Sequence, residues 1–214
     1  MNSIQPSVEI IDMQDYDSMI KKIEKIGRVC YKSEGNIRED SAERFITSLL
    51  KRGHESVIEH EAITVRMVCD RGVTHEIVRH RIASYSQEST RYCNYSGDKF
   101  GNAITVIDLA SGFGYDLSDP KDKAKYDIWN QAMEATEKFY FQMIEAGATP
   151  QEARSVLPNS LKTEIVMTMN LRAWRNFFRL RCDKAAHPQM RQLAKMAFDI
   201  FKEKLPVFFS DMEF

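Results

Sequence analysis

Two arginines and a histidine (Arg79, His80 and Arg81) are followed by four hydroxyl side chains and Arg91 within the next ten residues. Guanidinium groups bind phosphate oxygens in pairs and keep their charge in a desolvated site, and hydroxyl groups add directed hydrogen bonds. This pattern predicts a site for a phosphate-bearing ligand. The alternative is a solvated basic helix end, which needs no function.

A second basic cluster follows Asn170, which is expected to cap a helix. Arginines at positions 172, 175 and 179 share one face of that helix, and few acidic residues lie nearby in the sequence to pair with them. A helix start with an asparagine cap and several arginines predicts an anion-binding site. The alternative is a salt-bridged exterior face.

His54 and His60 raise the question of a metal site. Zinc-binding helices of one common type place two histidines four residues apart on one face, whereas these two are six residues apart. The spacing disfavours a metal hydrolase, which chelators would inactivate, and no metal is expected. His54 follows Gly53 at a helix end, where it can line a pocket or act as a surface cap.

The elements that must position these residues follow from periodicity and capping signals. Alternating apolar residues predict strands, periodic apolar stripes predict helices, and the segments 84–101 and 112–114 are expected to be loops. Helices and strands mix without a regular alternation, so the expected class is α+β. The expected helices cover residues 15–32, 41–52, 74–83, 122–146, 149–157, 170–181 and 188 onward, and the strands cover 62–69, 104–107 and 161–169.

The composition is that of a globular protein, with 214 residues of which 43% are hydrophobic and 29% are charged. This length predicts a single domain spanning residues 1–214. No run of 18 apolar residues exists, so no membrane-spanning helix is expected. Residues 1–14 lack the pattern of a signal peptide, and the four cysteines are scattered, so we expect a cytoplasmic protein.

The charge is balanced overall but uneven along the chain. The formal net charge is −1, whereas residues 154–195 hold nine Lys and Arg residues against only Glu164 and Asp183. This excess predicts a local anion site. The alternative function is a nucleic-acid-binding module that uses this basic stretch and neighbouring tyrosines, which would show steep salt dependence with oligonucleotides and would bind no cofactor.

Several separated blocks together resemble the flavin-dependent thymidylate synthases. Residues 79–91 match the RHR-x7-S-x-R signature of that family. Residues 53–60 resemble its GHE-S/T-xxEH segment, residues 152–158 its E-x-AR-x-x-LP segment, and residues 170–181 its N-x-R…N…LR segment. The resemblance spans about residues 8–208. It implies a fold with mixed helices around a largely antiparallel sheet.

The resemblance also implies a reaction. Members of the family methylate deoxyuridine monophosphate (dUMP) to thymidylate (dTMP), taking the carbon from 5,10-methylenetetrahydrofolate and the reducing equivalents from NADPH through FAD. The flavin carries the difficult chemistry, and the protein positions and polarises the reactants. The family's sites lie between the subunits of a homotetramer. The resemblance implies neither a nucleic acid nor a membrane as a partner.

Site residues are implied position by position. Positions that resemble the flavin site are His54, Ser56, Arg79, His80, Arg81, Gln87, Asn170, Leu171, Arg172 and Asn176. Positions that resemble the uracil-nucleotide site are Glu76, Arg79, Gln87, Glu88, Ser89, Thr90, Arg91, Arg154 and Arg181.

Within this set, Arg91 and Arg154 suit the phosphate, and Arg181 resembles the arginine placed against the uracil ring. A guanidinium does not act as a base at neutral pH, so the expected catalytic role of Arg181 is to stabilise negative charge that develops on the ring. Ser89 is expected to be a substrate ligand rather than a nucleophile, because no partner base stands at a fixed spacing from it.

Three positions depart from the family pattern. Ser86 and Gln87 stand where many members carry Asn-Glu, and Glu76 replaces a common glutamine. If the family contacts its ligand through the side chain at position 87, Gln87 removes a negative charge. If the contact is made by the backbone, little changes.

Overall fold

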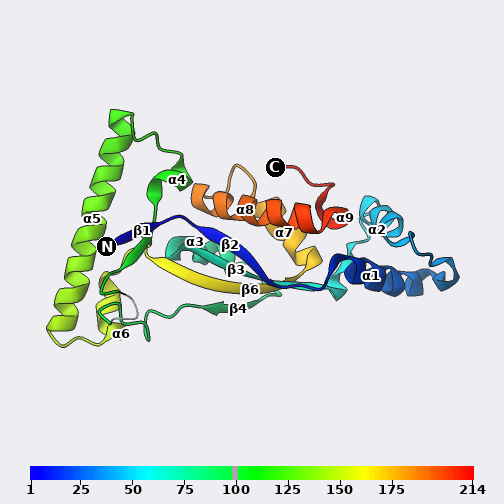
Figure 1. Ribbon diagram of the computed structural model, residues 1–214, viewed down its shortest axis with the longest axis horizontal. Coiled ribbons are helices and arrows are strands. Elements are labelled where there is room, and N and C mark those ends of the chain that lie inside the picture. The colour runs from blue at the N-terminus through cyan, green and yellow to red at the C-terminus, as the bar shows by residue number, and fades with distance from the viewer. Residues whose placement is uncertain (98–100) are drawn as a thin grey trace.

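The computed structural model of the chain describes residues 1–97 and 101–214 (Figure 1). Its strands are β1 (Asn2–Ile4), β2 (Ser7–Asp12), β3 (Ala62–Asp70), β4 (Ser84–Gln87), β5 (Thr105–Ile107) and β6 (Lys162–Asn170). Its α-helices are α1 (Tyr16–Tyr31), α2 (Ala42–Lys51), α3 (Arg71–Ile77), α4 (Leu109–Phe113), α5 (Pro120–Glu145), α6 (Pro150–Ala153), α7 (Leu171–Arg181), α8 (Pro188–Lys204) and α9 (Pro206–Phe209). Its 3-10 turns are η1 (Glu34–Asn36), η2 (Glu55–His60) and η4 (Arg154–Val156).

The main sheet has four antiparallel strands in the order β2-β3-β6-β4. The central pair, β3 and β6, is aligned from Ala62 beside Asn170 to Asp70 beside Lys162. Each of these two strands therefore feeds a helix at an opposite end of the sheet, α3 after Asp70 and α7 after Asn170. The α+β class and the largely antiparallel sheet are confirmed.

Helices cover one face of this sheet (Figure 1). Along β3 and β6 the buried side chains alternate with half-exposed ones, as expected when one face meets a core and the other meets solvent. The buried face packs against an aromatic layer formed by Trp174, Phe177 and Phe178 of α7 and Phe201 of α8, whose ring centroids lie 4.9–5.8 Å apart. Complete burial stabilises each such side chain by about 1.5–3 kcal/mol.

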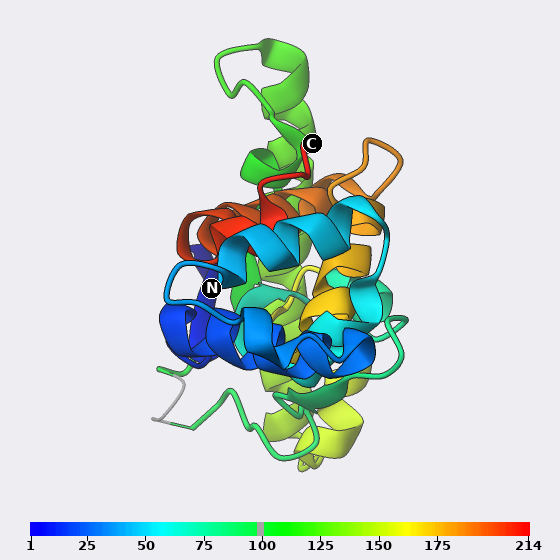
Figure 2. The same ribbon diagram turned by 90° about the vertical axis from the view of Figure 1, so that its right-hand side faces the viewer.

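The ends of the molecule are built differently. At one end, α2 packs between α1 and α9, as the view in Figure 2 shows. At the other end, α5 packs on α6, and the parallel pair β1–β5 lies beside them. A second buried cluster, which includes Tyr140 and Leu161, lies at this end. No helix among the described residues is long and apolar enough to cross a membrane.

Three local expectations are wrong. The helix expected at Thr74 begins at Arg71, because the side chain of Asp70 accepts a 2.6 Å hydrogen bond from the amide of Val73, and it ends at Ile77. The loop expected over residues 84–101 contains strand β4, because its polar residues pair with β6, and residues 98–100 lie outside the described part. Residues 112 and 113 belong to α4, where Gly112 lets the helix approach Gln189, and Gly114 caps the end of this helix with a positive φ.

Candidate active site

Arg79, His80 and Arg81 lie in the irregular segment between α3 and β4. Tyr85 of β4 anchors this segment by hydrogen bonds: its hydroxyl lies 2.5 Å from the carbonyl oxygen of His80 and 2.9 Å from that of Ile77. The chain then reverses at Ile82, which has a positive φ of 65°. This geometry turns the two arginines outward and the histidine inward, since His80 is buried and its neighbours are exposed.

A cavity of about 310 Å³ brings the segment together with α7. Five predicted site residues from two distant parts of the chain meet in it. Its lining consists of Arg79, His80, Arg81, Met169, Ala173, Asn176, Leu180 and Arg181. The guanidinium groups of Arg79 and Arg81 form no ion pair with a described residue, so their charge is available to an anionic ligand.

Arg181 is fixed within this cavity by three hydrogen bonds. Its Nε donates to Nε2 of His80 at 2.9 Å, and its Nη1 donates to Oε2 of Glu76 at 2.7 Å. Its Nη2 donates to the backbone carbonyl of Glu76 at 3.2 Å. The structure therefore joins a residue predicted for the flavin site, His80, to two residues predicted for the nucleotide site.

His80 is a neutral acceptor in this arrangement. It is buried against the edge of Phe177, with ring centroids 4.9 Å apart. Burial, and to a smaller extent the charge of Arg181, lowers the pKa of His80 to about 4. At neutral pH the unprotonated Nε2 accepts from Arg181, which assigns the proton of the ring to Nδ1.

Gln87 and Glu88 form a second group at the other end of β4. The side-chain amide of Gln87 donates to the hydroxyls of Thr74 and Thr163, at 3.2 and 3.3 Å, so it joins β4 to α3 and β6. The carboxylate of Glu88 accepts from Nζ of Lys162 at 2.9 Å and from the hydroxyl of Tyr95 at 3.2 Å. Both side chains already have protein partners.

Two further arginines, Arg91 and Arg154, form no ion pair with a described acidic residue. Ser89 accepts a 3.3 Å hydrogen bond from the amide of Arg91, and Thr90 is buried. The guanidinium of Arg91 lies 5.1 Å from the centroid of the Tyr92 ring and forms no ion pair with a described residue. Arg154, in η4, is exposed and equally without an acidic partner in the described chain.

A third group of predicted residues lies where η2 packs on the start of α7. Asn170 caps α7 as expected, accepting a 2.8 Å hydrogen bond from the amide of Ala173. The amide of Leu171 donates to the carbonyl of Glu61, which anchors the helix start to the segment after η2. Ser56 and Arg172 are exposed beside this junction, and Arg172 pairs with Glu59 at 2.5 Å.

His54 introduces η2, and its Nδ1 lies 2.8 Å from the hydroxyl of Tyr31. Among residues 1–97 and 101–214, no group of three His, Cys, Asp or Glu side chains is arranged to hold a metal ion.

The three arginines of the α7 face on which an anion site was expected all have acidic partners, which favours the alternative of a salt-bridged face. Arg175 is buried and pairs with Glu55 and Asp211, and it also donates to the carbonyl of Phe208. Arg179 shares the same carboxylate of Glu55 at 2.7 Å. The acids come from distant parts of the sequence, which is why local counting missed them. Five of the nine basic residues in the stretch 154–195 form ion pairs, which weakens the argument for the nucleic-acid alternative.

Two cations that the sequence analysis did not single out stand beside Glu88. Lys162 bridges Glu88 and Glu164, and Nη1 of Arg71 lies 3.2 Å from the carbonyl of Glu88. Arg71 directly follows the end of β3, and Lys162 is the first residue of β6. The alternating pattern that predicted these two strands was the sequence signal that could have pointed to both cations.

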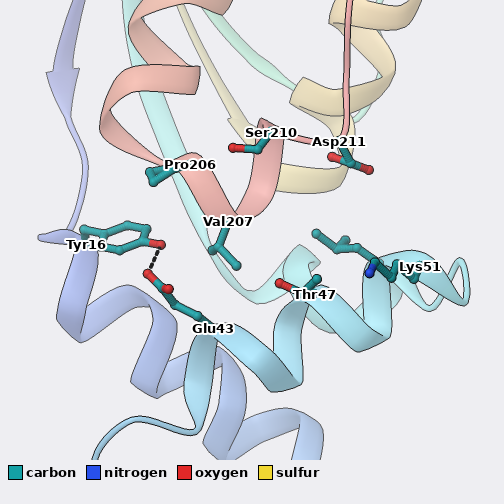
Figure 3. A pocket seen from close by; sticks show the side chains of 9 residues that line it. Tyr16, Glu43, Thr47, Lys51, Pro206, Val207, Ser210 and Asp211 are labelled. Carbon is teal, nitrogen blue, oxygen red and sulfur yellow. Dashed lines mark hydrogen bonds between the residues drawn. The ribbon is translucent and has the colours of Figure 1, made fainter.

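Cavity size alone does not identify the site. A second hollow of about 310 Å³ lies between α1, α2 and α9, where the hydroxyl of Tyr16 donates to Glu43 at 2.6 Å (Figure 3). It contains none of the predicted site residues. The cavity at Arg181 differs because Arg79 and Arg81 line it and form no ion pair with a described residue, an arrangement that suits an anionic ligand.

Comparison with known proteins identifies the class. The Thy1 family model, described as thymidylate synthase complementing protein, matches residues 12–207. A flavin-dependent thymidylate synthase of Pyrococcus abyssi is 35% identical over 78% of this chain and 66% of its own length. Others from Geobacter sulfurreducens and Corynebacterium diphtheriae are 34% and 32% identical, over 86% and 89% of this chain and 78% of each relative.

The chain belongs to the flavin-dependent thymidylate synthase family, a family of enzymes, and the resemblance drawn from its motifs is confirmed. It spans about two thirds of the length of the Pyrococcus relative.

Proposed function

We propose that this protein methylates dUMP to dTMP, with 5,10-methylenetetrahydrofolate as the carbon donor, NADPH as the reductant and FAD as the bound cofactor. The observation that carries the proposal is the hydrogen bond between His80 and Arg181, 101 residues apart in the sequence. It joins the two motifs that would hold the flavin and the nucleotide. We also propose that residues 1–214 form one domain.

The residues of the cavity fit FAD, because the unpaired guanidinium groups of Arg79 and Arg81 match a group that carries a pyrophosphate. When bound, FAD supplies the transfer of reducing equivalents. The chain's part is to bind and orient it. The residues proposed to do so are His54, Ser56, Arg79, His80, Arg81, Gln87, Asn170, Leu171, Arg172 and Asn176.

For the nucleotide, Arg91 and Arg154 are proposed to bind the phosphate, since both are exposed and have no acidic partner in the described chain. Arg181 would lie against the uracil and stabilise negative charge that develops at N3 and O2. Ser89 is proposed as a ligand, because its hydroxyl contacts a backbone amide and no base. The full proposed set is Glu76, Arg79, Gln87, Glu88, Ser89, Thr90, Arg91, Arg154 and Arg181.

A homotetramer with shared sites is also proposed. The residues proposed to bind ligands form separate groups around one subunit. The cavity of about 310 Å³ is at the small end of the range for a single drug-sized ligand, whereas the proposed site must hold both FAD and dUMP. Contributions from neighbouring subunits would complete the site. The proposed compartment is the cytoplasm, in keeping with the low cysteine content.

The first test is a visible spectrum of the purified protein, followed by anaerobic addition of NADPH with and without dUMP. We expect flavin absorbance that bleaches, with dUMP changing the bleaching rate. A protein that neither carries nor takes up FAD would contradict the proposal. An oligonucleotide salt titration would then test the alternative of a nucleic-acid-binding module.

A further inference from the structure

The guanidinium of Arg181 already has three of its five N–H donors in use. Two of the three acceptors belong to one residue: Glu76 offers a carboxylate oxygen at 2.7 Å and its own backbone carbonyl at 3.2 Å. The third acceptor is Nε2 of His80, four residues further along the chain. A planar group held at three corners cannot turn without breaking at least one of these bonds.

Among the described residues, one N–H on Nη1 and one on Nη2 of Arg181 have no acceptor, so the group can still donate hydrogen bonds to a ligand. Because the side chains of Arg181 and Glu76 are only 16% and 25% exposed, the interaction is partly shielded from water. The arginine therefore meets a ligand in a fixed plane, with its charge partly offset.

Glutamate at this position has a specific consequence. The family commonly carries glutamine here, whose amide oxygen can accept the same hydrogen bond but brings no charge. In this chain Arg181 is instead one half of an ion pair. The carboxylate strengthens the hydrogen bond and reduces the net positive charge that the cavity presents to an anionic nucleotide.

We propose that Glu76 is a positioning residue that acts on the nucleotide through Arg181, fixing the plane of the guanidinium and weakening its attraction for the anionic substrate. The proposal rests on the proposed function for the identity of the substrate. It replaces, for Glu76, the direct contact with the nucleotide that the proposed set above takes from family resemblance, because both acceptors of Glu76 that the structure pairs are bound to Arg181. Its two parts, orientation and charge, are separable by substitution.

Glu76→Gln keeps an acceptor and removes the charge, whereas Glu76→Ala removes both. We expect Glu76→Ala to lower kcat by about tenfold to a hundredfold, and Glu76→Gln to restore kcat to within about threefold of the parent while lowering KM for dUMP. A matched control is the pair Glu43→Gln and Glu43→Ala on α2, where the carboxylate accepts from Tyr16 at a hollow remote from Arg181. If both Glu76 variants lost the same activity, or neither lost any, the proposal would be overturned.

A double-mutant cycle tests action through Arg181. Affinity for dUMP is measured by its perturbation of the flavin spectrum in the parent, Glu76→Ala, Arg181→Ala and the double variant. If Glu76 acts through Arg181, removing Glu76 changes nothing once Arg181 is absent. A further loss of affinity in the double variant would mean that Glu76 touches the nucleotide itself.

A third measurement needs neither flavin nor nucleotide, so it separates failure of this proposal from failure of the proposed function. NMR of the flavin-free protein can follow the titration of His80, whose Nε2 accepts from Arg181. Burial is the larger cause of the lowered pKa of His80 and the charge of Arg181 the smaller one, so release of Arg181 in Glu76→Ala would raise the pKa of His80 from about 4 while burial still holds it below its ordinary value. An unchanged or lower pKa would show that Arg181 stays in place without Glu76 and would overturn the proposal.

Discussion

The imidazole of His80 accepts a 2.9 Å hydrogen bond from Nε of Arg181, and this contact joins the loop after α3 to the last turn of α7. It requires a neutral histidine, which burial provides. Because the two residues belong to motifs that resemble the flavin site and the nucleotide site, the bond couples the two parts of the proposed active site.

Replacement of Arg181 should reduce catalysis far more than flavin binding. Arg181→Ala removes a charged donor from the place where negative charge would develop, and loss of one such donor typically costs about a hundredfold to a thousandfold in kcat. The measurement compares the rate of dTMP formation with the FAD content of the same preparation. Full methylation activity in the variant would contradict the role given to Arg181.

Replacement of Arg91 should weaken the nucleotide and spare the flavin. Hydrogen bonds to a charged group are worth about 1.5–3 kcal/mol, so Arg91→Ala should raise the dissociation constant for dUMP about tenfold to a hundredfold. Spectral titration of the FAD-loaded protein measures this. The control is Arg44→Ala, an exposed arginine paired with Asp40 on α2. Equal dUMP affinity in the Arg91 variant and the control would remove Arg91 from the phosphate site.

Arg175 should matter for stability. Its side chain is 2% exposed and pairs with Glu55 and Asp211, so Arg175→Met leaves Asp211 without its partner, whereas Glu55 keeps Arg179. Breaking a fully buried pair costs about 3–5 kcal/mol of the free energy of unfolding, and we expect a smaller loss here because Asp211 is 47% exposed. Urea denaturation measures the loss.

The comparison for this experiment is Arg44→Met, where an exposed pair contributes about 0–1 kcal/mol. If Arg175→Met lowered the free energy of unfolding no more than Arg44→Met does, the ion pairs of Arg175 would not stabilise the fold.

Acid should destabilise the fold through His80. Burial lowers the pKa of His80 in the folded protein to about 4 from its ordinary value of about 6.5, so the unfolded chain binds the extra proton first as the pH falls. Stability from this group is complete above pH 6.5 and is lost as the pH falls from about 6.5 to about 4. The full effect is on the order of 3 kcal/mol.

His80→Gln should remove this part of the pH dependence, because glutamine does not titrate. The measurement is the free energy of unfolding of the flavin-free protein at pH 4.5, 5.5 and 7. Carboxylates add to the same slope, so the difference between parent and variant is the relevant quantity. A constant difference across this range would contradict a lowered pKa for His80.

Local signals predicted much of the fold. Asn170 caps α7 and Thr149 forms a capping box with Glu152, because each bond lies within one turn of its own helix. The alternation along residues 62–69 and 161–169 identified the central strands. The helix after β3 begins earlier than expected because Asp70 caps it, while the hydroxyl of Thr74 lies inside the helix and donates to the carbonyl of Arg71.

The site was predicted as a set of residues but not as an arrangement. The motifs identified Arg79, His80 and Arg181, yet nothing local could place Glu76 against Arg181 or Glu55 against Arg175. Those contacts join segments about a hundred residues apart, and they form only when β3 and β6 bring α3, η2 and α7 together. Gln87 was likewise predicted to bind a ligand. In the structure its side-chain amide donates to two threonine hydroxyls of the protein.

The central claim is tested most directly by product formation. The assay follows isotopically labelled methylene carbon from methylenetetrahydrofolate into dTMP, with FAD, NADPH and dUMP each omitted in turn. The account predicts labelled dTMP only when every component is present, and a loss of about a hundredfold or more in Arg181→Ala. Absence of labelled dTMP from the complete mixture with FAD-loaded protein, or its undiminished formation without the flavin, would contradict it.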